Sequence, residues 1–187
     1  WLLVEKCKNK RQKDKDLSMC GIAAVYSNDQ NILGKIDKII KKISYRGPDD
    51  RGSLQLNNNF SVGSCRLSIF DVSEKGKMPM NDSSNNYTIV YNGEIYNFPE
   101  IKKKFNISTK SGTDTEVILE LYSKLGVECI NHFNGIFSFI LFDKIKNIAF
   151  CCRDRLGVKP FYYYWNDEIF VASSEIKGVH EITEKNV

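Results

Sequence analysis

Histidine is scarce in this sequence: His132 and His180 are the only two in 187 residues, and they lie far apart along the chain. A histidine beside a cysteine is a common way to activate a thiol, but nothing in the sequence supports such a pair. The six cysteines form no Cys-x-x-Cys pair and have no zinc-ligand spacing with histidine. This pattern is typical of a reducing compartment, so we expect a cytoplasmic protein without a metal site.

Long apolar runs are also absent. No stretch approaches the roughly 20 apolar residues that a membrane-spanning helix needs. The apolar start over residues 1–4 is too short for a signal peptide, and its lysines follow rather than precede it. The sequence therefore predicts no membrane segment.

Excess positive charge is confined to the start of the chain. Residues 1–18 contain six Lys and Arg against three Asp and Glu, and so supply +3 of the net +4. Residues 1–18 could bind nucleic acid, but the interpretation as a solvated extension or a removable segment is favoured. The rest has no basic face dense enough to indicate nucleic acid. We expect one domain over 19–187.

The apolar pattern predicts strands, then helices, then strands again. This order is typical of an α+β protein in which sheets pack with helices in layers. The expected elements are strand 20–26, helix 31–44, strands 53–56, 60–66 and 87–91, helices 98–105 and 114–125, a short helix at 127–133, strands 136–142, 147–152, 160–164 and 168–173, and a helical turn at 175–180. Within them, Asn92-Gly93 is expected to end its strand in a turn, and Thr113 with Glu116 to form a capping box.

Cys20 is the most informative residue, because it directly follows Met19 and precedes an apolar strand. If translation starts at Met19, removal of that methionine makes Cys20 the first residue. An N-terminal cysteine carries a nucleophilic thiol and a base, since its α-amine has a reference pKa of about 7.7–8.0. A buried strand cysteine is the alternative interpretation.

Three polar groups could complete a small amide-binding site. Asn92-Gly93-Glu94 offers a side-chain amide and a glycine N–H, which suit an oxyanion hole, although Asn-Gly is also typical of a hairpin turn. Arg66 suits a carboxylate, and Asp114 at a helix start could receive an ammonium. A surface ion pair and a helix-dipole contact are their alternatives. An α-amino acid would satisfy Arg66 and Asp114 together, with its distal amide facing Cys20.

Eight short motifs occur in a fixed order along the chain. They are Met19-Cys20-Gly21-Ile22, Arg46-Gly47-Pro48-Asp49-Asp50, Arg66-Leu67-Ser68-Ile69, Asn92-Gly93-Glu94-Ile95-Tyr96-Asn97, Ser111-Gly112-Thr113-Asp114-Thr115-Glu116-Val117, Phe133-Asn134-Gly135-Ile136-Phe137-Ser138-Phe139, Arg153-Asp154-Arg155-Leu156-Gly157-Val158-Lys159-Pro160 and Ala172-Ser173-Ser174-Glu175-Ile176-Lys177. From residue 19 to about 180, the series resembles the glutaminase domain of glutamine-hydrolysing asparagine synthetases, which are class II glutamine amidotransferases. It looks less like the glucosamine-phosphate synthase and phosphoribosyl-pyrophosphate amidotransferase branches.

The resemblance implies an N-terminal-nucleophile hydrolase fold, a four-layer αββα sandwich with two antiparallel sheets. It also implies a role for each matching residue. By motif position these are Cys20 as nucleophile, Asn92 and Gly93 as oxyanion hole, Arg66 at the glutamine α-carboxylate, Asp114 and Glu94 around the α-amino group, backbone groups of Leu67, Ile69 and Phe70 along the pocket, and Arg46 and Asp49 as support. Phe70 stands where the family often has a smaller aliphatic residue.

The resemblance further implies that glutamine is hydrolysed without a cofactor. ATP and Mg would serve only a separate synthetase domain, in which ammonia attacks an aspartyl-adenylate. The sequence contains no Ser-Gly-Gly-x-Asp-Ser pyrophosphate loop, so we expect an N-terminal fragment of a longer enzyme, with glutamine and that domain as partners. A homodimer stays open.

Two other functions also stay open. The chain could be the glutaminase half of another amidotransferase, for example one acting on a sugar, or a non-catalytic glutamine-binding module. If residues 1–18 are retained, Cys20 has no free amine, and we then expect no glutaminase activity.

Overall fold

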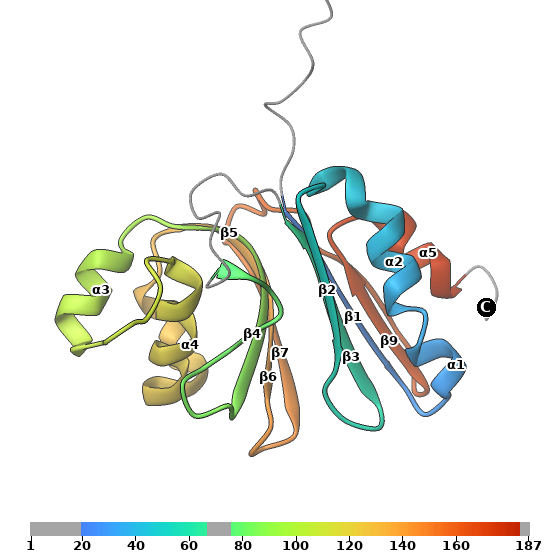
Figure 1. Ribbon diagram of the computed structural model, residues 1–187, viewed down its shortest axis with the longest axis horizontal. Coiled ribbons are helices and arrows are strands. Elements are labelled where there is room, and N and C mark those ends of the chain that lie inside the picture. Colours follow the sequence, from blue (N-terminus) through green and yellow to red (C-terminus); the bar gives the residue numbers. More distant parts are fainter. Residues whose placement is uncertain (1–19, 67–75, 184–187) are drawn as a thin grey trace, which may run out of the picture.

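The computed structural model describes residues 20–66 and 76–183, which form two facing antiparallel sheets (Figure 1). In the first sheet the strand order is β2-β3-β1-β9-β8, and in the second it is β4-β5-β6-β7. The strands are β1 (Gly21–Ser27), β2 (Asp50–Gln55), β3 (Phe60–Arg66), β4 (Met80–Asn81), β5 (Tyr87–Ile95), β6 (Gly135–Asp143), β7 (Ile148–Arg153), β8 (Tyr162–Trp165) and β9 (Ile169–Ser173).

Helices cover the outer face of each sheet, which gives four layers (Figure 1). The first sheet is covered by α1 (Gln30–Leu33), α2 (Ile36–Ile43) and α5 (Ile176–Thr183), and the second by α3 (Phe98–Phe105), α4 (Asp114–Leu125) and the 3-10 segment η3 (Gly126–His132). A further 3-10 turn, η1 (Ser44–Arg46), follows α2. The predicted αββα sandwich with two antiparallel sheets is confirmed.

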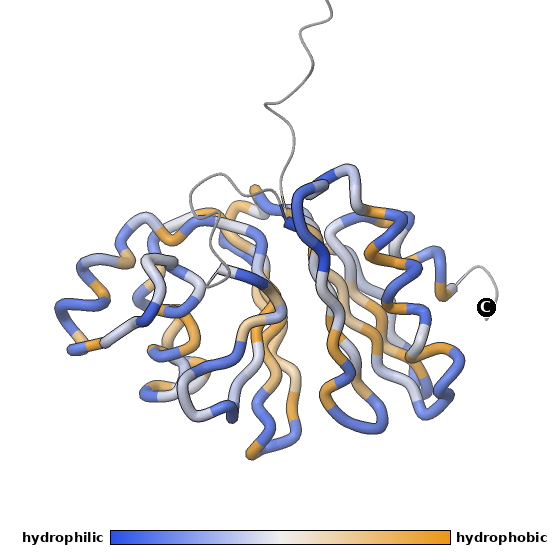
Figure 2. Tube along the Cα trace, in the orientation of Figure 1, coloured by the Kyte–Doolittle hydropathy of each residue, from blue (hydrophilic) through white to orange (hydrophobic). Residues whose placement is uncertain are grey.

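Three apolar cores hold these layers together. Alternation along β1 divides its side chains between two of them: Ala23 and Val25 face the helices, and Ile22 and Ala24 face the other sheet. The side chains between the two sheets are apolar as well, and Figure 2 shows hydrophobic residues along the facing strands of both sheets. We call the layer between the sheets the inner core. Its buried members are Ile22, Ala24, Phe60, Val62, Val90, Ile140, Phe142 and Ala172.

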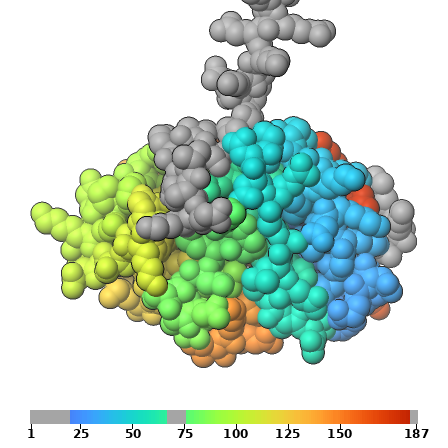
Figure 3. All heavy atoms as spheres, viewed as in Figure 1, coloured from blue at the N-terminus to red at the C-terminus, as the bar shows by residue number. Residues whose placement is uncertain are grey.

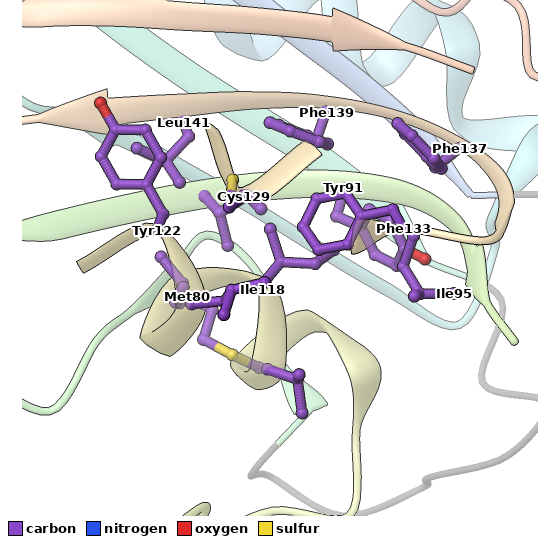
Figure 4. Close-up of a cluster of buried hydrophobic side chains, with 14 of the residues drawn as sticks. Met80, Tyr91, Ile95, Ile118, Tyr122, Cys129, Phe133, Phe137, Phe139 and Leu141 are labelled. Atoms are coloured by element: carbon purple, nitrogen blue, oxygen red, sulfur yellow. The ribbon is translucent and has the colours of Figure 1, made fainter. Parts of the chain in front are cut away.

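The helix-side core of the second sheet is rich in aromatic residues. Figure 4 shows Tyr91 from β5 and Phe137 and Phe139 from β6 beside Ile118 and Tyr122 of α4. Several of these rings pack face to face or edge to face, such as Phe137 on Phe139 with centroids 5.9 Å apart. The second sheet and its helices therefore form one packed unit. This unit lies against the first sheet, and the two meet at the molecular surface seen in Figure 3.

The structure corrects three local predictions. The strand at residue 87 does not end in a turn at Asn92-Gly93. It runs on to Ile95, because β6 pairs with it along its whole length and places Phe137 opposite Gly93. A Cβ at residue 93 would lie 2.4 Å from the Ile136 carbonyl oxygen, so the glycine allows the close approach of two strands rather than a turn.

The other two corrections concern helices. The helix predicted over 31–44 is two helices, because α1 closes at Gly34, whose N–H bonds to the Gln30 carbonyl, and α2 begins at Ile36. The predicted capping box does not form. Thr113 makes no side-chain cap, and the Glu116 carboxylate instead accepts backbone N–H groups of Lys110 and Ser111 at 2.8 and 2.7 Å.

The helix predicted over 98–105 has the same bounds as α3. Across 20–66 and 76–183, every helix is too short or too polar to cross a lipid bilayer.

Candidate active site

Strand alternation brings Cys20 and Asn92 to one end of the gap between the sheets. Ile22 and Val90 both belong to the inner core. Asn92 stands two residues after Val90 and so lies on the inward face of β5. Cys20, directly before β1, stands two residues before Ile22, so the alternation of β1 continued by one residue directs it to the same gap. Figure 1 shows that β1 starts, and β5 ends, at the same end of the sandwich. The nucleophile and amide predicted from sequence are therefore brought together.

Asn92 carries a buried hydrogen-bond donor without an acceptor. The residue is 2% exposed, and its Nδ2 has no hydrogen-bond partner among the described residues. An unmade buried hydrogen bond costs about 1–3 kcal/mol, so such a group in a folded protein calls for an explanation. An acceptor supplied by a ligand in the gap would satisfy it.

The backbone of Cys20, the predicted nucleophile, is anchored by a buried arginine. Arg46 is 7% exposed, and its Nε donates to the Cys20 carbonyl oxygen at 3.2 Å. Its Nη1 forms an ion pair with Glu175 at 2.5 Å. Two residues further on, Ile22 exchanges two hydrogen bonds with Ser174: the Ile22 N–H donates to Oγ, and the Ser174 N–H donates to the Ile22 carbonyl. The predicted supporting role of Arg46 thus has a concrete contact.

Asp114 begins α4 and lies over the end of β5. Its Oδ2 accepts the Tyr91 hydroxyl at 2.6 Å and the Ile95 N–H at 2.8 Å. Burial raises the pKa of Asp114, and the Tyr91 hydroxyl and backbone N–H groups offset part of that rise. Burial first and Asp114 second raise the pKa of Tyr91 well above its ordinary value. Once ionised, Asp114 would be a half-enclosed receiver for a cation.

Arg66 and Glu94 lie on different sheets. Arg66 is the last residue of β3, and its guanidinium lies over Gly76, where a Cβ would approach Nη2 to 2.7 Å. Glu94 lies on β5 opposite Ile136 and is exposed. The predicted pocket residues Leu67, Ile69 and Phe70 lie outside the described residues, so their predicted role stays a prediction.

The loop after β7, which contains most of the Arg153–Pro160 motif, lies beside the candidate site, although the motif alone indicated no role for it. Asp154 is 7% exposed and accepts backbone N–H groups from both strand and loop, which are those of Phe137, Leu156, Val158 and Lys159. Burial raises the pKa of Asp154, but these donors outweigh burial and the net pKa is lowered. The loop is thereby held beside Phe137, which pairs with Gly93. The sequence signal for this loop is Asp154-x-x-Gly157, because an aspartate side chain that accepts nearby backbone N–H groups is typical of a turn.

The two histidines lie in the helical layers rather than in the gap between the sheets. His132 belongs to η3, where its ring packs on Phe105 at 4.8 Å, and His180 belongs to α5. A Cys–His pair therefore has no support in the geometry. In the part of the chain that the structure describes, no three His, Cys, Asp or Glu side chains gather as a metal site would require.

Comparisons with known proteins agree with this geometry. The sequence model of the glutamine amidotransferase domain matches residues 19–187. The chain is 47% identical over 186 residues to a putative glutamine-hydrolyzing asparagine synthetase 2 of Methanocaldococcus jannaschii, covering 90% of this chain and 36% of that protein. It is 36% identical over 169 residues to asparagine synthetase 3 of Bacillus subtilis, covering 86% of this chain and 27% of that protein. The chain thus spans about a third of the length of these curated relatives.

A solved structure shares the fold. Glutamine phosphoribosylpyrophosphate amidotransferase from B. subtilis superposes with a TM-score of 0.72 at 14% identity, over 88% of this chain and 44% of that one. The predicted N-terminal-nucleophile hydrolase fold is confirmed. Because the family match covers residues 19–187, and with them all of the described residues, the chain belongs to the glutamine amidotransferase domain family.

Proposed function

We propose that this domain hydrolyses the side-chain amide of glutamine through Cys20, giving glutamate and ammonia. The observation that carries the proposal is the buried, unpartnered Nδ2 of Asn92, which faces the same end of the gap as Cys20. A donor that is desolvated in advance is what an amide oxygen needs as it becomes negative. The family match supports the same reaction class.

The proposed chemistry has two steps. The Cys20 thiol attacks the amide carbon, and the Cys20 α-amine takes its proton, directly or through water, and passes it to the departing ammonia. Asn92 Nδ2 and the Gly93 N–H stabilise the oxyanion. Water then attacks the thioester on Cys20, which releases glutamate and restores the thiol. The glutaminase step needs no cofactor.

This mechanism requires that residues 1–19 are absent from the active form, because Cys20 otherwise has no free amine. We therefore propose that residues 1–18 are an extension outside the working domain. The start of the family match at residue 19 supports this boundary.

Substrate recognition is assigned to the charged residues around the gap. Arg66 would hold the glutamine α-carboxylate, and Asp114 with Glu94 would hold the α-ammonium. The pair of donors on Asp114 Oδ2 supports this role, because they favour the ionised carboxylate despite its burial. Backbone groups of Leu67, Ile69 and Phe70 would line the same pocket.

The acceptor of the ammonia is proposed from the relatives. These relatives are named as asparagine synthetases, and this chain covers only part of their length. We propose that the ammonia serves asparagine formation in a further synthetase domain, which would use ATP and Mg. The described cysteines are all free, which supports a reducing compartment such as the cytoplasm.

Glutamate release from glutamine tests the proposal, with one protein starting at Trp1 and one at Met19 whose initiator methionine is removed. We expect release only from the second, and none after Cys20→Ala. Glutamine binding without release by the folded second protein would overturn hydrolysis and favour a binding module.

A further inference from the structure

Lys159 is a cation at this site that the mechanism above does not use. It is half-buried in the loop between β7 and β8. We infer that Lys159 is an electrostatic support of the Cys20 nucleophile, and that its ammonium stabilises the negative charge that develops on the sulfur and the amide oxygen. The inference rests on the proposed function and adds a residue to that site.

The loop that carries Lys159 is fixed at both of its ends to β6. At one end, the Asp154 carboxylate binds the N–H groups of both Phe137 and Lys159. At the other end, the Pro160 carbonyl accepts the Ser138 hydroxyl at 3.4 Å. Since Phe137 pairs with Gly93, and Ser138 with Asn92, the loop lies beside the predicted oxyanion hole.

Arg153 braces the Lys159 backbone from the other side. Its Nε donates to the Lys159 carbonyl at 2.6 Å, and its Nη2 donates to the Gly157 carbonyl at 2.5 Å. Gly157 has a φ of +66°, and a Cβ there would lie 3.0 Å from the Arg153 guanidinium carbon. The backbone N–H and C=O of Lys159 are therefore both held, so its side chain starts from a fixed point.

Four charged groups act electrostatically on the Lys159 ammonium. They are Cys20 before β1, Arg46 of η1, Glu94 of β5 and Asp154 of its own loop. Burial lowers the pKa of Lys159, Arg46 lowers it further, and Cys20, Glu94 and Asp154 raise it. Half-burying an ammonium beside an arginine is unfavourable unless negative charge compensates it.

The reaction adds a further negative charge within the reach of this cluster. When the Cys20 proton moves to the α-amine, the sulfur becomes negative, and attack transfers this charge to the amide oxygen. Lys159 forms no bond and transfers no proton in these steps. It lowers the energy of both charged states.

Alkylation of Cys20 tests the inference without relying on turnover. The protein starting at Met19 is treated with uncharged iodoacetamide and, separately, with anionic iodoacetate, and the Cys20 peptide is quantified by mass spectrometry. For Lys159→Met we expect the iodoacetate-to-iodoacetamide rate ratio to fall roughly three- to tenfold, as one charge acting across a partly solvated gap would give. The fall should shrink in 1 M salt, where the Debye length is about 3 Å.

Matched variants separate charge from structure. Lys159→Arg should keep the parent ratio, and Lys146→Met, which removes an exposed lysine at the other end of the sandwich, should keep it as well. Lys159→Gln is the second neutral variant if Lys159→Met does not fold. In glutamate release, Lys159→Met should lower kcat by a similar factor with little change in KM.

An unchanged alkylation ratio in a folded neutral variant would overturn the inference. An equal fall in Lys159→Arg would overturn it too, because charge would then not be the cause. Failure of the parent protein to release glutamate would instead count against the proposed function, since the alkylation ratio remains measurable in that case.

Discussion

The two sheets contribute differently to the site. On the first sheet, the backbone around the proposed nucleophile Cys20 is held in place: Arg46 donates to the Cys20 carbonyl, and Ser174 exchanges two hydrogen bonds with Ile22. On the second sheet, Asn92 presents a buried donor with no partner among the described residues. In the proposed mechanism the first sheet positions Cys20 and the second supplies the Asn92 donor, so the chemistry depends on how well the inner core holds the two together.

The largest effect is therefore expected from a substitution in the inner core, which supports both sheets. Ile140 is fully buried between the sheets, directly below the site, and Ile140→Ala should lower the free energy of unfolding by about 2–5 kcal/mol. It should also lower kcat for glutamine at temperatures where the protein is folded, because Cys20 and Asn92 lose their common support. Urea unfolding and glutamate release measure the two effects.

Ile118→Ala is the matched control for that variant. Ile118 is equally buried, but it lies in the helix-side core of the second sheet. We expect a similar loss of stability with kcat retained. Equal losses of kcat in both variants would show that the inner core has no special role.

Removing the Asn92 donor tests the role proposed for the second sheet. Asn92→Ala should lower kcat by about 10²–10³, or about 2.7–4 kcal/mol in the barrier, with little change in KM. Because the Nδ2 group makes no hydrogen bond within the described residues, the variant should lose little stability. Asn59→Ala, at the other end of the sandwich, is the control. A large loss of stability with kcat intact would contradict the account.

Weakening the Arg46–Glu175 ion pair tests the role proposed for the first sheet. Glu175→Gln leaves the buried Arg46 guanidinium with a neutral partner, and should lower the free energy of unfolding by roughly 1–3 kcal/mol. We also expect a lower kcat, since Arg46 holds the Cys20 carbonyl. Glu181→Gln, which removes the more exposed ion pair with Lys42, should cost about 0–1 kcal/mol. Thermal unfolding of the two variants measures both losses of stability. Equal losses would show that the Arg46–Glu175 pair is no more important than the exposed pair.

The smallest expected effect concerns the pH dependence of binding on the second sheet. Asp114 must be ionised to hold an ammonium, and its raised pKa means that glutamine binding weakens as pH falls through a value above the usual one of about 3.9. The Tyr91 hydroxyl lowers that pKa, so Tyr91→Phe should raise it further.

The KM for glutamine should therefore begin to rise at a higher pH in Tyr91→Phe than in the parent, with equal KM values at neutral pH and above. Tyr87→Phe should leave the profile unchanged, because the Tyr87 ring packs on Tyr122. Profiles that coincide for Tyr91→Phe and the parent would argue against Asp114 as the ammonium receiver.

Much of the site could be read from the sequence, because its residues stand next to strong local patterns. Cys20 precedes an apolar strand, Arg66 ends one, and Asp114 starts a helix, and the structure places each of them there. The turn predicted at Asn92-Gly93 was wrong because pairing with β6, a contact between distant segments, overrides the local preference for a turn.

The contacts between distant residues could not be predicted in this way. Arg46 and Glu175 are separated by 129 residues, and Tyr91 and Asp114 by 23. No local pattern encodes such pairs, since they arise when the sheets and helices pack. For the same reason the motif containing Lys159 could be recognised, but the electrostatic interaction of Lys159 with Cys20 could not.

The most direct test of the account is mass spectrometry of the protein starting at Met19, acid-quenched shortly after mixing with glutamine. The account predicts a peptide that begins at Cys20 and carries a glutamyl thioester, which is absent after Cys20→Ala and builds up more slowly after Asn92→Ala. Continued glutamate release by Cys20→Ala, or a glutamyl group on another cysteine, would contradict it.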